Sequence, residues 1–328
     1  MDDSLPTVIL RPGEADRVLA GHPWIYKGNI LRITAPAEDG SIVQVKDHRH
    51  RFLGIGFFNS KSKIQVRVID SERVEVTPAY LEQKIRAALA LRQKALPAAT
   101  SFRVVNAESD FLSGLIVDKY ENVLVFQTSS LGMELRKDVI VSALMTIFDP
   151  RAIVERNDIG SRKFEGLPEI HQVVHGKLDG PFPILLNGVK LNVDLMAGHK
   201  TGYYLDQQRN YQLVSNYAKN GVVLDCFSFL GGFALHSARG GATHVQGLDQ
   251  SAEAVAAAKQ NAELNGVSSV CSFEEANVFD WLKANTTVAR NERVVPRYDL
   301  IILDPPSFTR SRDSVPDALR GYKEIHLR

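Results

Sequence analysis

From residue 221 onward, strand-like and helix-like segments alternate with a regularity that few folds accommodate. The strand-like runs are "GVVLD", "HVQGLD", "VCSFEEAN" and "YDLIILDPP", and helical patterns separate them. Such alternation predicts a parallel, doubly wound sheet with right-handed crossovers. Ligands of these sheets bind outside the carboxyl ends of the strands. A polar residue lies at the carboxyl end of each predicted strand, so we expect four side chains around one crevice: Asp225, Asp249, Asn277 and Asp304.

The residues before this alternating region predict two smaller modules. Residues 5–70 hold β-rich runs such as "SIVQVKD" and "FLGIGFF", which predict a small β-barrel. A helix is predicted next, capped by Thr77 and ended by Pro97, and the chain up to residue 180 mixes strands with a helix near 134–147. A chain of 328 residues is too long for one ordinary core. We therefore expect three domains: a β-barrel at 1–75, an α+β domain at 76–183 and an α/β domain at 184–328.

Composition excludes several classes of protein. The formal net charge is +1, so the overall charge gives no reason to expect nucleic acid, and local clusters must carry that argument. The two cysteines, Cys226 and Cys271, lie in apolar surroundings, which indicates a reducing compartment. The N-terminus lacks a basic start followed by an apolar run, and no segment has the apolar length of a membrane span. We expect a cytoplasmic protein.

The loop after the first predicted strand argues against a dinucleotide. A Rossmann fingerprint needs G-x-G-x-x-G there, whereas this loop reads "DCFSFLGGF" and places Phe227 and Phe229 where a pyrophosphate would approach. The loop fits a sulfonium ligand better. Asp249, with Gln250 beside it, can accept hydrogen bonds from both ribose hydroxyls, and Asn277 followed by an apolar residue suits an adenine. A single strand-end acid or amide is often only a helix cap, but four such side chains in register favour a binding site.

At this point the chain resembles a known group of enzymes. The motifs "LDCFSFLGGFALHSARGGA", "GLDQSAEAV", "NVFDWL" and "LDPPSF" are similar, in order, to those of class I S-adenosylmethionine-dependent methyltransferases. More closely, "RPGEADRVLAGHPWIY", "NAESDFLSGLIVDKY" and "HKTGYYLDQQRN" resemble the large-subunit ribosomal RNA cytosine-C5 methyltransferases with an N-terminal PUA domain. The resemblance covers essentially the whole chain. It implies a Rossmann-like α/β methyltransferase domain, preceded by a PUA-like barrel and a small α+β domain.

The resemblance also implies site residues. Asp225, Gly231 and Gly232 would line the methionine side of S-adenosylmethionine, Asp249 the ribose, and Asn277 with its neighbour the adenine. Asn277 departs from the aspartate usual in this family; its carbonyl can still accept a hydrogen bond from the adenine amino group, so we expect lower affinity without loss of binding. The expected cofactor contacts are Asp206, Gln207, Asp225, Phe229, Gly231, Gly232, Asp249, Gln250, Asn277, Val278 and Asp304.

The same resemblance assigns Asp304 to the target base. The acid before the prolines faces the flipped base in this group, and Pro305 keeps it from relaxing into the loop. An amino-methyltransferase is the nearest alternative, but those enzymes place an aromatic directly after the second proline to stack on the base. Here that position is Ser307, and Phe308 comes one residue later. The sequence therefore favours methylation at carbon.

Methylation at carbon-5 of cytosine requires a thiolate that adds to carbon-6 of the ring. The family supplies it from a Ser-Cys-Ser-like loop after a fifth strand, which we expect beyond Arg328. Cys226 belongs to the cofactor loop, where we expect it to face the cofactor, and Cys271 lies inside a predicted strand, so neither is a convincing substitute. We interpret the sequence as a methyltransferase truncated at its C-terminus. A non-catalytic RNA-binding protein that kept the fold is the alternative left open.

A basic and aromatic segment suggests where RNA binds. Residues 46–67 carry six Lys or Arg and one Asp, with phenylalanines between them, which suits phosphate contacts and base stacking. A solvated barrel surface explains the same composition, and the PUA resemblance favours RNA. "HQVVH" would place His171 and His175 at ligand spacing on a helix, but without a third ligand we expect no metal. Ribosomal RNA is the expected partner, no membrane is expected, and a homodimer is left open. The predicted RNA contacts are Lys46, Arg49, Arg51, Lys61, Lys63 and Arg67.

Overall fold

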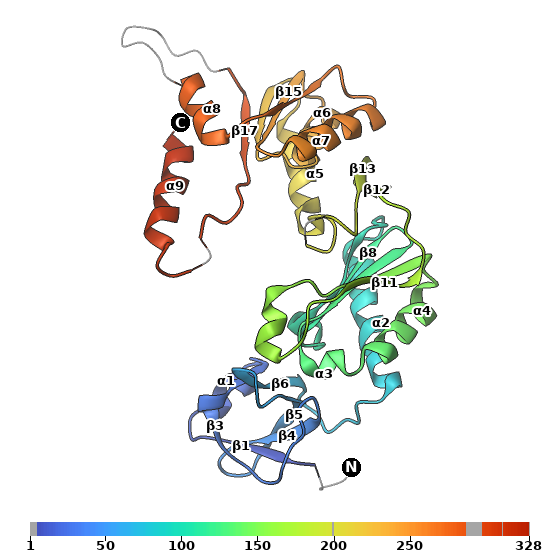
Figure 1. Ribbon diagram of the computed structural model, residues 1–328, viewed down its shortest axis with the longest axis vertical. Coiled ribbons are helices and arrows are strands. Elements are labelled where there is room, and N and C mark those ends of the chain that lie inside the picture. Colours follow the sequence, from blue (N-terminus) through green and yellow to red (C-terminus); the bar gives the residue numbers. More distant parts are fainter. Residues whose placement is uncertain (1–4, 199, 287–296, 310, 328) are drawn as a thin grey trace. The chain divides into compact units, whose positions relative to one another are not determined.

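The computed structural model describes residues 5–198, 200–286, 297–309 and 311–327 (Figure 1). Contacts divide the chain into two compact units. The first comprises residues 1–180 and 194–205, and the second comprises residues 181–193 and 206–328. The chain therefore enters the second unit for a short hairpin, returns to the first, and then forms the rest of the second. No helix in the described ranges is long and apolar enough to cross a membrane.

The first unit begins with the β module predicted from the sequence. It is a six-stranded sheet in the order β2-β6-β5-β4-β1-β3, in which β1 and β4 run parallel and the other pairs antiparallel. Its core is made of strand side chains such as Val8, Val43 and Val66, all fully buried. The elements are β1 (Thr7–Leu10), α1 (Ala15–Leu19), β2 (Trp24–Tyr26), η1 (Lys27–Asn29), β3 (Ile30–Ile33), β4 (Ile42–Lys46), β5 (Phe52–Phe58) and β6 (Ile64–Asp70).

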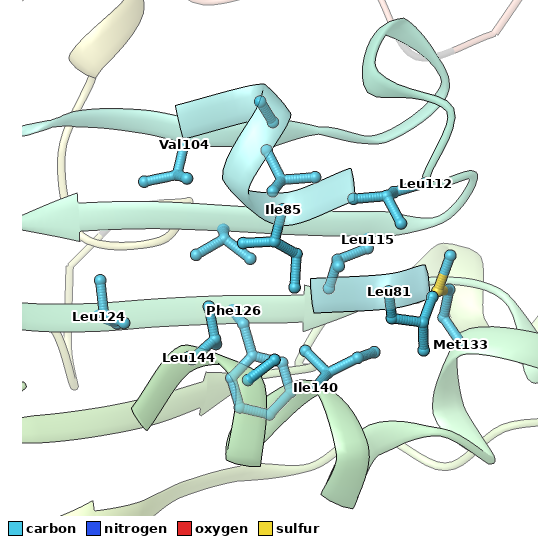
Figure 2. Close-up of a cluster of buried hydrophobic side chains, with 14 of the residues drawn as sticks. Leu81, Ile85, Val104, Leu112, Leu115, Leu124, Phe126, Met133, Ile140 and Leu144 are labelled. Carbon is cyan, nitrogen blue, oxygen red and sulfur yellow. The ribbon is translucent and has the colours of Figure 1, made fainter. Parts of the chain in front are cut away.

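A five-stranded sheet with helices follows, in the order β11-β10-β9-β8-β7. Helix α2 (Pro78–Ala95) begins as predicted, because the Thr77 side chain accepts a hydrogen bond from the Tyr80 N–H and Pro78 occupies the first turn. Figure 2 shows Leu81 and Ile85 of this helix packed with Phe126 of the sheet and Leu144 of α4. The remaining elements are β7 (Phe102–Asn106), η2 (Ala107–Asp110), β8 (Leu115–Tyr120), β9 (Val123–Thr128), α3 (Leu131–Glu134), α4 (Lys137–Phe148), β10 (Ala152–Arg156), η3 (Gly160–Glu165) and β11 (His171–Gly176).

His171 and His175 lie on strand β11 and not on a helix, so they do not have the spacing of a helical ligand pair. Successive residues of a strand are about 3.3 Å apart along its axis, and positions four apart are therefore well separated. Across the described ranges, no cluster of three or more His, Cys, Asp or Glu side chains is arranged to hold a metal ion.

The second unit starts with a hairpin, β12 (Phe182–Leu186) and β13 (Val189–Val193). Its turn residues, Asn187 and Gly188, have φ of 50° and 84°, as a two-residue hairpin turn of this type requires. The sheet that follows is parallel, in the order β16-β15-β14-β17, which confirms the predicted Rossmann-like arrangement. Its strands are β14 (Val222–Cys226), β15 (His244–Asp249), β16 (Cys271–Glu275) and β17 (Leu300–Leu303).

Helices cover both faces of this parallel sheet (Figure 1). Leu224 and Cys226 pack into a cluster with Val278 and Leu282 of α8 and Ile325 of α9. The opposite face of the strands contacts α6 and α7. The helices of the unit are α5 (Gln208–Tyr217), preceded by η4 (Leu205–Gln207), and α6 (Gly232–Arg239), α7 (Ala252–Leu264), α8 (Val278–Thr286) and α9 (Val315–Leu327).

Candidate active site

The three predicted strand-end acids meet at one edge of the parallel sheet. Cys226 of β14 pairs with Leu248 of β15 and with Leu303 of β17. Asp225, Asp249 and Asp304 each adjoin one of these three residues in the sequence, so they lie at the same edge of the sheet. Asp225 is close enough to Asp249 and Asp304 to feel both negative charges. The predicted convergence of these acids is therefore present in the structure.

Asp225 is the most constrained of the three. Its side chain is fully buried, and its Oδ2 accepts a hydrogen bond of 3.0 Å from the N–H of Ala234 in the first turn of α6. Its Oδ1 is buried without a hydrogen-bond partner. Burial, followed by the charges of Asp304 and Asp249, raises the pKa of Asp225 to about 8. A cationic group near Oδ1 would relieve this unfavourable arrangement.

The loop between β14 and α6 is held in an unusual backbone conformation. Phe227 and Phe229 have φ of 65° and 48°, and Gly231 has φ of 84°. The N–H of Phe229 donates to Oδ2 of Asp249 at 2.8 Å, so the acid at the end of β15 supports the loop after β14. A β-carbon on Gly231 would lie 3.1 Å from Cζ of Phe273, which leaves little room for a larger residue.

Asp249 and Asn277 also accept hydrogen bonds from backbone N–H groups at or near the start of the helix that follows each of them. Oδ1 of Asp249 accepts from the N–H of Ser251 at 3.0 Å, while Oδ2 supports the loop. Oδ1 of Asn277 accepts from the N–H groups of Phe279 and Asp280 at the start of α8, at 3.0 and 3.3 Å. We expected the side-chain carbonyl of Asn277 to accept a hydrogen bond from the adenine, but this oxygen caps α8. The side-chain NH₂ is therefore the group that can donate a hydrogen bond to a ligand.

The predicted contacts before β14, Asp206 and Gln207, lie on η4, and Gln207 reaches Asp304. The side-chain amide of Gln207 donates to Oδ2 of Asp304 at 3.1 Å, and Asn210 donates to Oε1 of Gln207 at 2.6 Å. Asp206, its neighbour on η4, is exposed. Sequence reasoning missed Asn210, although its three-residue spacing from Gln207 at a helix start was a usable signal.

The remaining predicted cofactor residues border these groups. Gln250 is exposed beyond the end of β15, Gly232 is buried as the first residue of α6, and Val278 is buried at the start of α8. Pro305 is half-buried directly after Asp304. Their contact with a cofactor or a base stays a prediction.

Phe308 is partly buried and packs against side chains of α8 and α9. Its ring centroid is 4.5 Å from that of Tyr322 and 5.6 Å from that of Phe279, within the cluster under α8 and α9. Its N–H donates to the Tyr322 hydroxyl at 3.3 Å. The aromatic ring nearest to the two prolines in the sequence is therefore occupied in packing, which disfavours a role in stacking on a base.

Neither cysteine is placed to act as a nucleophile. Cys226 is fully buried in the cluster under α8 and α9, so the expectation that it faces the cofactor is wrong. Cys271 is also buried, with Sγ 3.9 Å from the carbonyl oxygen of Ala234. Burial raises the pKa of each thiol to about 12.

The six basic residues predicted to contact RNA have different surroundings. Lys46, Arg49 and Arg51 lie at the end of β4 and in the turn after it, where Nε of Arg51 is 3.2 Å from Asp47. Lys61 and Lys63 are exposed on the turn between β5 and β6.

Arg67 differs from the other five. Its side chain is only 11% exposed and forms ion pairs with Glu108 and Glu165, at 3.3 and 2.9 Å. This arrangement points to a structural role, and we leave Arg67 out of the proposed RNA surface.

Comparisons with known proteins agree with this geometry. A family described as a PUA-like domain matches residues 8–71, and a family described as S-adenosylmethionine-dependent methyltransferase matches residues 171–325. Ribosomal RNA large subunit methyltransferase I of Klebsiella pneumoniae is 36% identical over 333 residues, covering 100% of this chain and 82% of the relative. The protein of the same name from Vibrio vulnificus is 36% identical over 327 residues, covering 98% of this chain and 81% of the relative.

Solved structures support the fold over nearly the full chain. A protein described as a SAM-dependent methyltransferase from Streptococcus mutans has a TM-score of 0.77 at 22% identity, covering 97% of this chain and 82% of that one. A methyltransferase-like protein solved as a complex with SAH has a TM-score of 0.78 at 21% identity, with the same coverage.

Proposed function

The chain belongs to the S-adenosylmethionine-dependent methyltransferases, in the family of ribosomal RNA large subunit methyltransferase I, and from this we propose that it methylates ribosomal RNA at carbon-5 of cytosine. The observation that carries the proposal is Asp304, which is held at the carboxyl end of β17 between Pro305 and the amide of Gln207. A carboxylate fixed there can meet a base that is turned out of its stack. Ser307 stands where amino-methyltransferases place the aromatic that stacks on the base, and the packing of Phe308 occupies the nearest ring, which favours carbon over an exocyclic amine.

The residues present fit the cofactor. Asp225 offers a buried carboxylate oxygen without a partner, which suits a cationic ligand group. We assign the methionine side to Asp225 with Gly231 and Gly232, and the ribose to Asp249. S-adenosylmethionine supplies an electrophilic methyl group when it is bound.

Asn277 would meet the adenine differently from an aspartate. Its carbonyl caps α8, so its NH₂ is the group that can donate to a ring nitrogen. The cofactor would then lose an acceptor for its amino group, which is consistent with the weaker binding expected from the sequence.

Methylation of carbon-5 begins when a thiolate adds to carbon-6. Residues 1–328 contain two cysteines, and both are buried with raised pKa values. We therefore propose that neither Cys226 nor Cys271 provides this thiolate. Asp304 would then orient the base for attack by a thiol other than these two.

The RNA partner follows from the same family. We propose that the PUA-like module contacts RNA through Lys46, Arg49, Arg51, Lys61 and Lys63, and that the enzyme acts in the cytoplasm, where we expect its substrate. A homodimer stays a prediction, which light scattering on the purified protein tests.

Mapping of ribosomal RNA by mass spectrometry tests the proposal. RNA from cells that lack the gene should lose a methyl group at one cytosine carbon-5, and the native gene should restore it. A gene carrying Asp304→Asn should not restore it, whereas Asp313→Asn, which changes an exposed acid nine residues later, should. A lost methyl group on an exocyclic nitrogen would instead indicate an amino-methyltransferase, and no change in the RNA would contradict both.

A further inference from the structure

The short helix η3 of the first unit exposes a lysine and a phenylalanine between two buried charged residues. Lys163 is exposed and Phe164 is 59% exposed, whereas Arg162 before them is fully buried and Glu165 after them is 4% exposed. Nζ of Lys163 lies 5.3 Å from the centroid of the Phe164 ring. A single exposed phenylalanine is common on protein surfaces. The contacts of the two buried residues, Arg162 and Glu165, determine how Lys163 and Phe164 are held.

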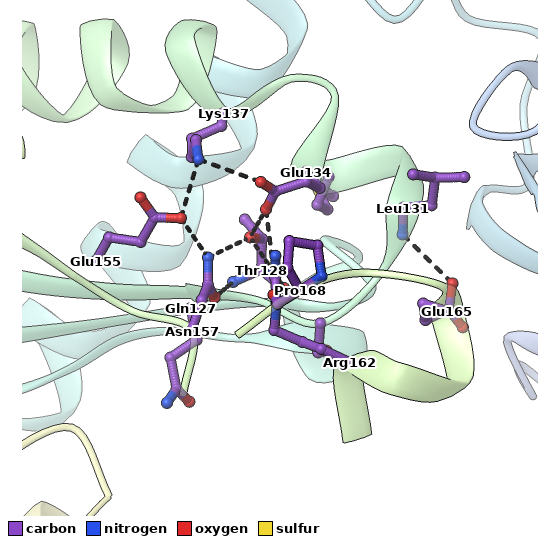
Figure 3. A network of polar contacts seen from close by, with 12 residues as sticks. Gln127, Thr128, Leu131, Glu134, Lys137, Glu155, Asn157, Arg162, Glu165 and Pro168 are labelled. Carbon is purple, nitrogen blue, oxygen red and sulfur yellow. Dashed lines mark hydrogen bonds and ion pairs between the residues drawn. The ribbon is translucent and has the colours of Figure 1, made fainter. Parts of the chain in front are cut away.

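Arg162 fixes η3 to the α+β sheet (Figure 3). Its Nε donates to the carbonyl oxygen of Pro168 at 2.8 Å, and its NH1 donates to Oε2 of Glu134 at 3.0 Å and to the Thr128 carbonyl. Lys137 is paired with the other oxygen of Glu134 at 3.2 Å. Buried ion pairs of this kind tolerate little movement, because displacement of one partner leaves a buried charge unpaired.

Glu165 fixes the other end of η3 to the β5–β6 turn of the β module. Its Oε1 accepts from the Ser62 hydroxyl at 2.7 Å and from Arg67 at 2.9 Å, and its Oε2 accepts from the Asn59 amide at 3.0 Å. Burial acts to raise the pKa of Glu165, but the hydrogen bonds from these three residues and the charge of Arg67 lower it overall. The carboxylate is thus held ionised between two sequence regions about 100 residues apart.

This contact brings η3 beside two of the exposed lysines of the β module. Lys61 and Lys63 flank Ser62, whose hydroxyl donates a hydrogen bond to Glu165. A β-carbon on Gly166 would lie 3.5 Å from Cδ of Lys61, which shows how closely the two segments approach. Three lysines and one phenylalanine are therefore presented from two rigidly joined segments.

We infer that Lys61, Lys63, Lys163 and Phe164 form one surface, the junction surface, that binds a single-stranded segment of the RNA substrate. The lysines supply cations for phosphates, and the exposed ring supplies a face on which a base can stack. A protein partner is less well matched, because interfaces between proteins are depleted in lysine. The inference rests on the proposed RNA substrate and deepens it, since it assigns the α+β domain a share of RNA recognition.

Fluorescence anisotropy with a fluorescein-labelled single-stranded RNA tests the stacking contact. Phe164→Leu keeps an apolar side chain but removes the aromatic face, and should weaken binding about fivefold or more. Phe111→Leu is the matched control, because Phe111 is 61% exposed in the same unit and also has a lysine near its ring, with Nζ of Lys84 at 5.4 Å. The control should bind RNA as the parent does.

The salt dependence of the same titrations tests the cationic contact. Lys163→Gln should reduce the slope of log affinity against log salt by about 0.7, the value for one phosphate contact on a single strand. Lys94→Gln, which changes an exposed lysine at the end of α2, should leave the slope unchanged.

Two results would overturn the inference, and they are distinguishable. If the parent binds RNA and both Phe164→Leu and Lys163→Gln behave as their controls do, the junction surface is wrong while the proposed function stands. If the parent binds neither single-stranded nor duplex RNA, the proposed RNA substrate fails and the junction surface fails with it.

Discussion

The side-chain amide of Gln207 donates a hydrogen bond of 3.1 Å to Oδ2 of Asp304, joining a helix start to a strand end 97 residues later. Asn210 donates to the amide oxygen of Gln207, so the NH₂ group is turned towards the carboxylate. Pro305 restricts the backbone of Asp304 from the other side. The orientation of the carboxylate is thus set by contacts from two separate segments.

Replacing Gln207 by glutamate should impair methyl transfer without unfolding the protein. The substitution exchanges a donor for a second negative charge facing Asp304, and a displaced catalytic group costs about tenfold or more in rate. The rate at which ribosomal RNA becomes methylated after induction of the variant gene measures this loss. Gln212→Glu, which makes the same charge change at an exposed position of α5, should match the parent. Equal rates for the two variants would contradict the assignment.

Much of the methyltransferase domain was predictable because its signals are local. The Asn187–Gly188 turn and the Ser251 cap of α7, whose hydroxyl accepts from Ala254, each depend on a few neighbouring residues. The strand-end acids could also be predicted, because parallel strands in register bring their carboxyl ends to one edge of the sheet.

Some contacts could not be predicted, because sequence neighbours do not reveal them. Arg67 had the composition of an RNA contact, but its partners lie 41 and 98 residues away, and only the fold brings them together. The expectation that Cys226 faces the cofactor was wrong. Adjacent residues of a strand point to opposite faces of the sheet, so an inward-facing Asp225 already implied that Cys226 lies under the other layer of helices.

Asp249 should contribute both to cofactor binding and to the loop that surrounds it. Asp249→Ala removes the acceptor for the N–H groups of Phe229 and Ser251 as well as the charge near the ribose. Binding of S-adenosylmethionine should weaken about tenfold to a hundredfold in titration calorimetry. Asp249→Asn keeps one acceptor oxygen and should lose less, while Glu253→Ala, an exposed acid in the first turn of α7, should bind normally. An unchanged dissociation constant for Asp249→Ala would remove this residue from the site.

The buried Asp225 should make the second unit less stable as the pH rises. Its folded pKa is about 8 and its unfolded value is near 3.8, so between these values the folded state holds a proton that the unfolded state has lost. The stabilising effect of this proton is complete below pH 3.8 and is lost as the pH rises through about 8. Asp225→Asn cannot ionise, and its free energy of unfolding should fall less steeply over this range.

Urea titrations at several pH values measure this difference. The chain has two tryptophans, Trp24 in the first unit and Trp281 in the second, so a Trp24→Phe background makes the fluorescence report on the second unit alone. The free energy of unfolding should fall with pH more steeply in the parent than in Asp225→Asn, by up to about 1.4 kcal/mol per pH unit. Parallel pH profiles would show that Asp225 is already ionised in the folded protein.

The two thiols should be inert in the folded protein. Cys226 and Cys271 are buried with pKa values of about 12, so almost no thiolate is present at pH 8. A thiol-specific chromogenic disulfide should detect neither cysteine in the native polypeptide and both after unfolding in guanidinium.

For the same reason, neither thiol should form a covalent adduct with RNA that carries 5-fluorocytosine at the target position. Any adduct that does form should survive Cys226→Ala and Cys271→Ala. An adduct that Cys226→Ala abolishes would identify that residue as the nucleophile, and would require α8 and α9 to move away from the sheet to expose it.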